Sequence, residues 1–151
     1  MKKIIAIDVG NSETTVGVGN SNEWTGYRFT TRKTITSDEL LMMFKTIIDI
    51  KPIKENKVDG AIICSVVPQI TNSVALATSK FISKDAIVVG PGIKTGLKVN
   101  IDNPKELGPD RIANSIGGYM KVKSPVIVVD LGLSLIHISE PTRLLSIAFA
   151  V

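Results

Sequence analysis

The fold is decided by the stretch Ile4–Val18, which reads IIAIDVGNSETTVGV. Apolar residues lead up to Asp8, the small polar residues Gly10–Ser12 follow, and a second apolar-rich segment begins at Thr14. This pattern predicts a tight β-hairpin, with Gly10 supplying the positive φ that the turn needs.

The tip of this hairpin carries groups that suit the phosphates of a nucleotide. Backbone N–H groups and hydroxyls can hold phosphate oxygens, and the Asp8 carboxylate faces the Mg²⁺ that the phosphates carry. The hydroxyls are those of Ser12, Thr14 and Thr15. An ordinary polar hairpin between two core strands is an equal alternative from this stretch alone, because short glycine motifs give many false matches.

The composition indicates a soluble, cytoplasmic protein. A chain of 151 residues with 44% hydrophobic residues can form one domain with a core, or one domain and the start of another. The formal charge of +4 favours anionic small molecules as ligands. The sequence has no block of Lys and Arg residues, so nucleic acid is not expected as a partner. The single cysteine, Cys64, lies in an apolar run and is expected to be buried. Too few apolar residues precede Asp8 for a signal peptide or a membrane span, so no membrane partner is expected.

The rest of the chain predicts an α/β domain with the element order β-β-β-α-β-α-β-α-β. This is the order of the ribonuclease-H-like fold, a mixed sheet with helices on both faces. The expected elements after the hairpin are a strand at Glu23–Thr30, a helix from an N-cap at Ser37 to Lys51-Pro52, a strand at Ala61–Val67, a helix from Pro68 to about Ile82, a strand at Ala86–Val89, a glycine-rich loop at Gly90–Leu97, a helix from Gly108 to about Tyr119 and a strand at Val126–Val129.

Two segments of the chain look like copies of one unit. Ile4–Gly10 (IIAIDVG) and Val126–Gly132 (VIVVDLG) are each an apolar strand followed by Asp, any residue and Gly. Two such hairpins facing each other would clasp one nucleotide. Chance similarity of two buried strands is the alternative, and the element order favours duplication.

The motifs together resemble the type III pantothenate kinases of bacteria, in the superfamily of actin, sugar kinases and heat-shock ATPases. They occur in that family's order over residues 1–132, and each is weak alone. They are DVGNSETT at Asp8–Thr15, SVVP at Ser65–Pro68, GPGIKTGL at Gly90–Leu97, DNP at Asp102–Pro104, GPDR at Gly108–Arg111 and VVDLG at Val128–Gly132.

The resemblance implies a phosphotransferase that uses ATP to phosphorylate the primary hydroxyl of pantothenate, the first step of coenzyme A biosynthesis. Asp8 would lie near Mg²⁺, through water, and Asp130 would help to bind a monovalent cation, K⁺ or NH₄⁺. The full-length form would be a homodimer. The residues that would hold the ATP phosphates are Asp8, Val9, Gly10, Asn11, Ser12, Glu13, Thr14 and Thr15.

Asp110 matches the family's general base, which takes the proton of the attacking hydroxyl. Gly108, Pro109 and Arg111 belong to the same pantothenate-binding segment. A carboxylate in this role orients the hydroxyl, and a helix N-terminus keeps it ionised. Without the other motifs, Asp110 and Arg111 would be explained better as the first turn of an ordinary solvent-exposed helix, where an acidic residue is favourable to the helix dipole, than as part of a substrate site. At two positions the chain departs from the family's usual residues. Pro109 stands where the family usually has alanine, and Ser12 stands where it usually has threonine, although serine retains the hydroxyl.

The last part of the chain departs from the family. Leu133–Arg143 reads LSLIHISEPTR, which resembles the in-frame translation of a transposon-end sequencing adapter. We therefore expect a native N-terminal domain at 1–120, the first strand of a truncated second domain at 121–132 and a non-native tail at 133–151. His137 would then have no function, and the chain as printed would be inactive.

Two other functional classes compete with a kinase. A non-catalytic nucleotide-binding regulator could use the same fold, because fold does not fix function. A DNA-binding factor is disfavoured, because no basic recognition helix or stripe is visible in the sequence.

Overall fold

The computed structural model describes residues 2–50, 58–90, 93–100, 107–131, 136–139 and 146–147. The chain divides into two compact units, Met1–Val89 and Gly90–Val151, and each is described by itself. The sequence motif at Asp102–Pro104 and the glycine Gly132 lie outside the described residues. The domain boundaries expected from the sequence remain a prediction.

The first unit begins with a three-stranded antiparallel meander. Its strands are β1 (Ile4–Val9), β2 (Glu13–Gly19) and β3 (Trp24–Thr30). The β1–β2 register pairs Val9 with Thr14, so the connecting loop is short and the predicted hairpin is confirmed. The third antiparallel strand is confirmed as well.

Parallel strands and crossover helices complete this unit. They are α1 (Ser37–Ile50), β4 (Gly60–Ser65), α2 (Pro68–Ile82) and β5 (Ile87–Val88). The sheet order is β3-β2-β1-β4-β5, with β4 parallel to both β1 and β5. The sequence therefore predicted the α/β class and the mixed sheet of the ribonuclease-H-like order correctly.

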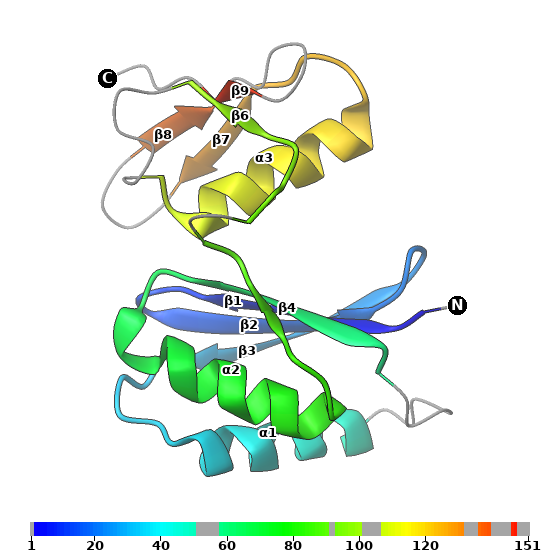
Figure 1. Cartoon of the computed structure of the whole chain (residues 1–151), viewed down its shortest axis with the longest axis vertical. Helices are drawn as coiled ribbons and strands as arrows, with labels where there is room; N and C mark the ends of the chain where they lie inside the picture. The colour runs from blue at the N-terminus through cyan, green and yellow to red at the C-terminus, as the bar shows by residue number, and fades with distance from the viewer. Residues whose placement is uncertain are drawn as a thin grey trace. The chain divides into compact units, whose positions relative to one another are not determined.

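The helices α1 and α2 lie side by side on one face of this sheet (Figure 1). Alternate residues of the strands point into that layer: Ile5, Ile7 and Val9 of β1 are buried, as is Val16 of β2. Rings from the two helices, Phe44 and Phe81, meet edge to face with centroids 6.1 Å apart. Since α3 belongs to the second unit, helices on the other face of the sheet remain a prediction.

The start of α1 differs by one residue from the sequence prediction. The N-cap is Thr36 and not Ser37, because the Thr36 hydroxyl accepts the N–H of Glu39 at 3.3 Å while the Glu39 carboxylate accepts the N–H of Thr36 at 2.9 Å. This reciprocal pair is a capping box. The start of α2 at Pro68 is as predicted.

The second unit contains one helix and short strand pairs. The elements are β6 (Lys98–Val99), α3 (Pro109–Val122), β7 (Val128–Leu131), β8 (Ile136–Ser139) and β9 (Ser146–Ile147). The strand β7 pairs with β8 in antiparallel fashion, and β6 pairs with β9 in parallel. Gly118 lets α3 approach β7, because a Cβ there would lie 2.9 Å from Cγ2 of Val128.

The described helices give no sign of a membrane span. None of them is both long enough and apolar enough to cross a bilayer.

Candidate functional site

The hairpin turn that the sequence singled out is closed tightly. The N–H of Gly10 donates to the carbonyl of Glu13 at 2.9 Å, and a Cβ at position 10 would lie 2.9 Å from that same oxygen. The predicted positive φ at Gly10 is wrong: in the part of the chain that the structure describes, Gly96 is the one glycine with positive φ. Glycine is needed at position 10 for space and not for its conformation.

Two backbone donors of the turn remain available to a ligand. Asn11 and Ser12 are exposed, and no hydrogen bond within the described residues uses their N–H groups. Adjacent free N–H groups in a turn form a concavity that suits an anion. The turn therefore offers the backbone part of a phosphate site.

The three hydroxyls predicted at the tip do not lie together. Thr14 faces the helices and is buried, and its Oγ1 lies 2.8 Å from Oγ1 of Thr31. Ser12 is exposed in the turn, whereas Thr15 lies on the opposite face of the sheet from Thr14. The Thr14 side chain is thus part of the interior of the unit, and Thr14 could contact ATP only through its backbone.

The face of the sheet opposite α1 and α2 carries a row of polar side chains beside the turn. The exposed Asp8 pairs with Thr15 of β2, and Thr15 pairs in turn with Arg28 of β3. On the other side Asp8 is next to Cys64 of β4, which is buried as expected. The sequence analysis missed Arg28. Side chains alternate between the two faces along a strand, so pairing β3 with the hairpin would have placed the Arg28 cation on the same face as Asp8.

The carboxyl ends of β1 and β4 meet at the same edge, next to the turn. The N–H of Val66 donates to the carbonyl of Val9 at 3.0 Å, which ties the SVVP motif to the end of β1. The Ser65 hydroxyl accepts the hydroxyl of Thr71 at 2.8 Å and fixes the first turn of α2. In open α/β sheets, ligands bind outside the carboxyl ends of the strands, where this motif lies.

In the second unit, Asp110 occupies the first turn of α3, as predicted. Its carboxylate folds back over Gly108, and a Cβ on Gly108 would overlap with Oδ1 of Asp110. This oxygen is buried and has no hydrogen-bond partner among the described residues. A buried carboxylate oxygen without a donor is costly, so the position suits a group that brings a proton.

The neighbours of Asp110 fit a helix start. Pro109 is at the first helical position, where its missing N–H is not needed by the helix, and Arg111 is partly buried. Ser115, one turn further, is fully buried, and its Oγ has no partner among the described residues. Sequence analysis did not single out Ser115, because a serine in a helix has no distinctive pattern.

The remaining predicted positions are only partly described. The backbone of Asp130 lies in β7, opposite His137 of β8, and its side chain is not among the described features. In the glycine-rich loop, Gly96 takes a φ of 77°, which fits a glycine turn. The structure brings Asp8–Thr15 together in one unit and Gly108–Arg111 in the other, with no common site described.

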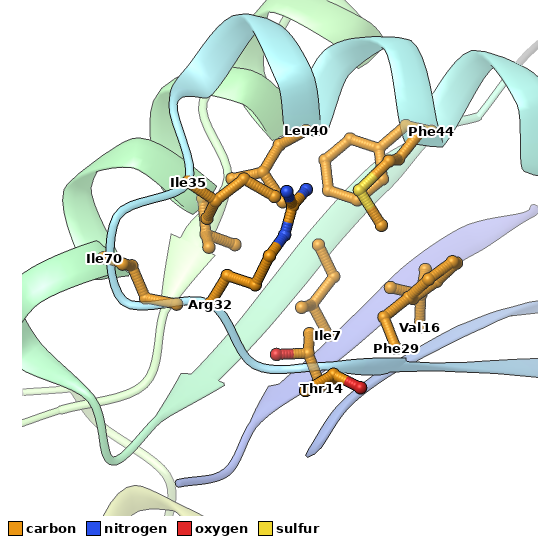
Figure 2. Close-up of a pocket in the computed structure, with 12 residues that line it drawn as sticks. Ile7, Thr14, Val16, Phe29, Arg32, Ile35, Leu40, Phe44 and Ile70 are labelled. Atoms are coloured by element: carbon orange, nitrogen blue, oxygen red, sulfur yellow. The ribbon is translucent and has the colours of Figure 1, made fainter. Parts of the chain in front are cut away.

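A small cavity between the sheet and the helices α1 and α2 is part of the core and not a ligand site (Figure 2). Its volume is about 20 Å³, and its lining is apolar apart from Thr14, Thr30 and Arg32. A space of this size holds about one water molecule. It is too small for a nucleotide.

A divalent metal would depend on the phosphates that bring it. The described residues contain no group of three or more acidic, histidine or cysteine side chains close enough to hold an ion. Mg²⁺ typically takes one or two carboxylates together with substrate phosphates, and the exposed Asp8 beside the turn fits that arrangement.

Comparison with known proteins identifies the family. A family model described as type III pantothenate kinase matches residues 4–136. The chain belongs to this family. Type III pantothenate kinases of two Bifidobacterium longum strains are each 38% identical to it over 140 residues, covering 91% of this chain and 55% of the relative. The type III pantothenate kinase of an Exiguobacterium strain is 37% identical over 130 residues, covering 85% of this chain and 51% of the relative.

The chain thus spans about half the length of the curated type III pantothenate kinases that it matches. Among solved structures it is similar to YeaZ from Pseudomonas aeruginosa, with a TM-score of 0.48 at 10% identity over 100% of this chain and 65% of that one. It is also similar to the Ppx/GppA phosphatase of Aquifex aeolicus, with a TM-score of 0.48 at 12% identity over 94% of this chain and 49% of that one.

Proposed function

We propose that this chain is the N-terminal part of an enzyme that transfers the γ-phosphate of ATP to the primary hydroxyl of pantothenate. The observation that carries the proposal is the family match over residues 4–136, which includes both the hairpin Asp8–Thr15 and the segment Gly108–Arg111. The reaction is the first step of coenzyme A biosynthesis in the family that the sequence resembles.

The hairpin binds the phosphates of ATP. The available N–H groups of Asn11 and Ser12, the Ser12 hydroxyl and the exposed Asp8 support this assignment. Phosphoryl transfer depends on positioning and on neutralising charge, so backbone donors that are held in place are the main requirement. Asp8 would hold Mg²⁺ through water, and the ion would neutralise negative charge on the phosphates.

Asp110 acts as the general base. Its Oδ1 lacks a hydrogen-bond donor among the described residues, and a substrate hydroxyl would supply one. From the first turn of α3, the carboxylate accepts the proton as the hydroxyl oxygen attacks the γ-phosphorus and ADP leaves. Arg111, Pro109 and Gly108 complete the segment that binds pantothenate.

The other parts of the proposal rest on the family resemblance. Asp130 helps to bind a monovalent cation, K⁺ or NH₄⁺, and the full-length protein is a cytoplasmic homodimer without nucleic-acid or membrane partners. The assignment of residues 133–151 as a tail foreign to the native protein rests instead on the adapter-like string Leu133–Arg143, and with such a tail the chain as printed would be inactive.

The test is an ADP-release assay on the product of the complete gene, with Mg²⁺, ATP and K⁺. Release of ADP that requires pantothenate, together with a phosphorylated product, supports the proposal. Binding of ATP without pantothenate-dependent ADP release would instead favour the non-catalytic regulator. The 151-residue chain in the same assay is expected to release no ADP.

A further inference from the structure

Thr31, directly after β3, joins the linker before α1 to the turn of the hairpin. Its N–H donates to the carbonyl of Ser12 at 2.8 Å, and its Oγ1 donates to the carbonyl of Gly10 at 2.8 Å. The same Oγ1 lies 2.8 Å from Oγ1 of Thr14. Thr31 therefore contacts the turn residues on both sides of Asn11 and also the first buried residue of β2.

The direction of each hydrogen bond follows from counting protons. A hydroxyl has one proton, and a carbonyl oxygen can only accept. Because Thr31 gives its proton to Gly10, the hydrogen bond between the two threonines has Thr14 as donor and Thr31 as acceptor. The resulting chain runs from Thr14 through Thr31 to the carbonyl of Gly10, and each bond polarises the next.

This chain of hydrogen bonds sets the orientation of the turn's peptide units. In a planar trans peptide the carbonyl of one residue and the N–H of the next point in opposite directions. Holding the Gly10 carbonyl towards Thr31 therefore turns the N–H of Asn11 away from Thr31. The N–H of Gly10 is already bound to Glu13, so the turn has little freedom left.

We propose that Thr31 is a positioning residue of the phosphate hairpin: its hydroxyl fixes the peptide between Gly10 and Asn11 so that the Asn11 N–H is presented to a phosphate oxygen. The inference rests on the proposed function in one respect, which is that this hairpin binds ATP. The fixing of the turn itself is a property of the free chain and can be measured without any ligand.

The first experiment measures backbone amide hydrogen exchange by NMR in the ligand-free 151-residue chain. Thr31→Val keeps the shape of the side chain and removes the hydroxyl, whereas Thr31→Ser keeps the hydroxyl. Thr31→Val removes the hydrogen bond to the Gly10 carbonyl, and the Gly10 N–H closes the same turn on the carbonyl of Glu13. The turn should then open more readily, so we expect exchange at the Gly10 N–H to be about fivefold faster in Thr31→Val and nearly unchanged in Thr31→Ser.

The second experiment measures steady-state kinetics in the product of the complete gene. We expect Thr31→Val to raise KM for Mg-ATP about tenfold and Thr31→Ser to restore it to within about twofold of the original. The KM for pantothenate should change by less than about twofold in both variants, because the hydroxyl orders only the hairpin.

A matched control separates positioning from stability. Thr78 is fully buried, and its hydroxyl donates to the carbonyl of Val74 at 2.6 Å within α2, away from the hairpin. Thr78→Val removes the same chemical group from the same unit. It should lower the unfolding midpoint without moving KM for Mg-ATP, whereas Thr31→Val should raise that KM even at equal stability.

Each outcome decides the proposal. Unchanged exchange at Gly10 in Thr31→Val overturns it, and so does faster exchange with an unchanged KM for Mg-ATP, which would leave only a structural role. If the complete protein shows no kinase activity, the proposed function fails, and the exchange comparison still decides whether Thr31 fixes the turn.

Discussion

The hairpin turn and the start of α3 differ in whether their polar groups have hydrogen-bond partners within the described residues. In the turn, the Gly10 and Ser12 carbonyls are bound by Thr31, and the Gly10 N–H is bound by Glu13. At the start of α3, Oδ1 of Asp110 is buried without a donor among the described residues. The turn is thus ordered before a ligand arrives, whereas the α3 segment holds a group that a ligand would satisfy.

This difference suits two different tasks. A site for phosphates must hold its donors in place before binding, because their reorganisation would cost part of the charge stabilisation. A base must keep its reactive oxygen free of competing donors, because a hydrogen bond to a carboxylate lowers its basicity. Substitutions on each side of this comparison should separate the two tasks, from the largest effect to the smallest.

Removing the base should have the largest effect. We expect Asp110→Asn in the complete protein to reduce kcat by roughly 10²–10⁴-fold, the usual contribution of general acid–base catalysis. The KM for Mg-ATP should change little, because the hairpin is intact. Steady-state kinetics give both values. Asp85→Asn, at an exposed position after α2, is the control with the same chemical change. A kcat near that of the control would rule out Asp110 as the base.

Removing the carboxylate beside the turn should have the next largest effect. Hydrogen bonds to charged groups contribute about 1.5–3 kcal/mol, so Asp8→Ala should weaken Mg-ATP binding about 10- to 100-fold. Calorimetric titration of the complete protein with Mg-ATP measures this affinity. Asp85→Ala should leave it unchanged. If the Asp8→Ala protein is folded and binds Mg-ATP with the original affinity, Asp8 does not take part in binding the metal.

The glycine beneath the base offers a finer test. A Cβ at position 108 would overlap with Oδ1 of Asp110, so Gly108→Ala should turn the carboxylate out of its place. Small displacements of catalytic groups are costly, and we expect kcat to fall about tenfold, measured as above.

The matched control for this variant lies on the same helix. Gly117 of α3 is exposed, and a Cβ added there would meet nothing within 4 Å beyond the backbone of its own helix. Gly117→Ala should therefore stabilise α3 and leave kcat unchanged. Equal kcat in Gly108→Ala and Gly117→Ala would show that Gly108 does not set the position of Asp110.

Local patterns in the sequence were sufficient to predict most of the first unit. The alternation of apolar residues in β1 and β2 placed the hairpin, and Pro68 placed the start of α2. The N-cap of α1 was assigned one residue late because Thr36 and Ser37 are both good caps. Only Thr36 has a glutamate three residues later, and that spacing could have decided the question.

Features that depend on contacts between folded segments could not be predicted from the motifs alone. Thr31 reaches Gly10 across 21 residues, and nothing in the neighbourhood of Thr31 indicates that bond. The inward orientation of Thr14 follows from the strand register, which the hydroxyl pattern of the tip alone does not reveal. The restricted space at Gly10 likewise appears only when the Glu13 carbonyl is in place.

The smallest expected effect concerns the capping box of Thr36 and Glu39 at the start of α1, which follows the loop that contains Thr31. The Thr36 N–H and hydroxyl donate to the Glu39 carboxylate and hold the pKa of Glu39 below its ordinary value of 4.5. Because the folded-state pKa is lowered, the stabilisation is present above pH 4.5 and is lost as the pH falls through the folded-state pKa. Glu39→Gln should therefore lower the unfolding midpoint by about a few degrees at pH 7.

The difference between Glu39→Gln and the original chain should shrink when the pH is lowered from 7 to a value below the folded-state pKa of Glu39, since protonation then removes the charge of the original side chain. Thermal unfolding followed by circular dichroism at the two pH values measures it. Glu23→Gln, in the exposed turn before β3, controls for the loss of one negative charge from the surface. A difference that is the same at both pH values would mean that the charge of Glu39 does not stabilise α1. The loop that carries Thr31 would then be held at its helix end by the uncharged hydrogen bond from the Glu39 N–H to the Thr36 hydroxyl and by packing of Ile35 and Leu40, which are both buried.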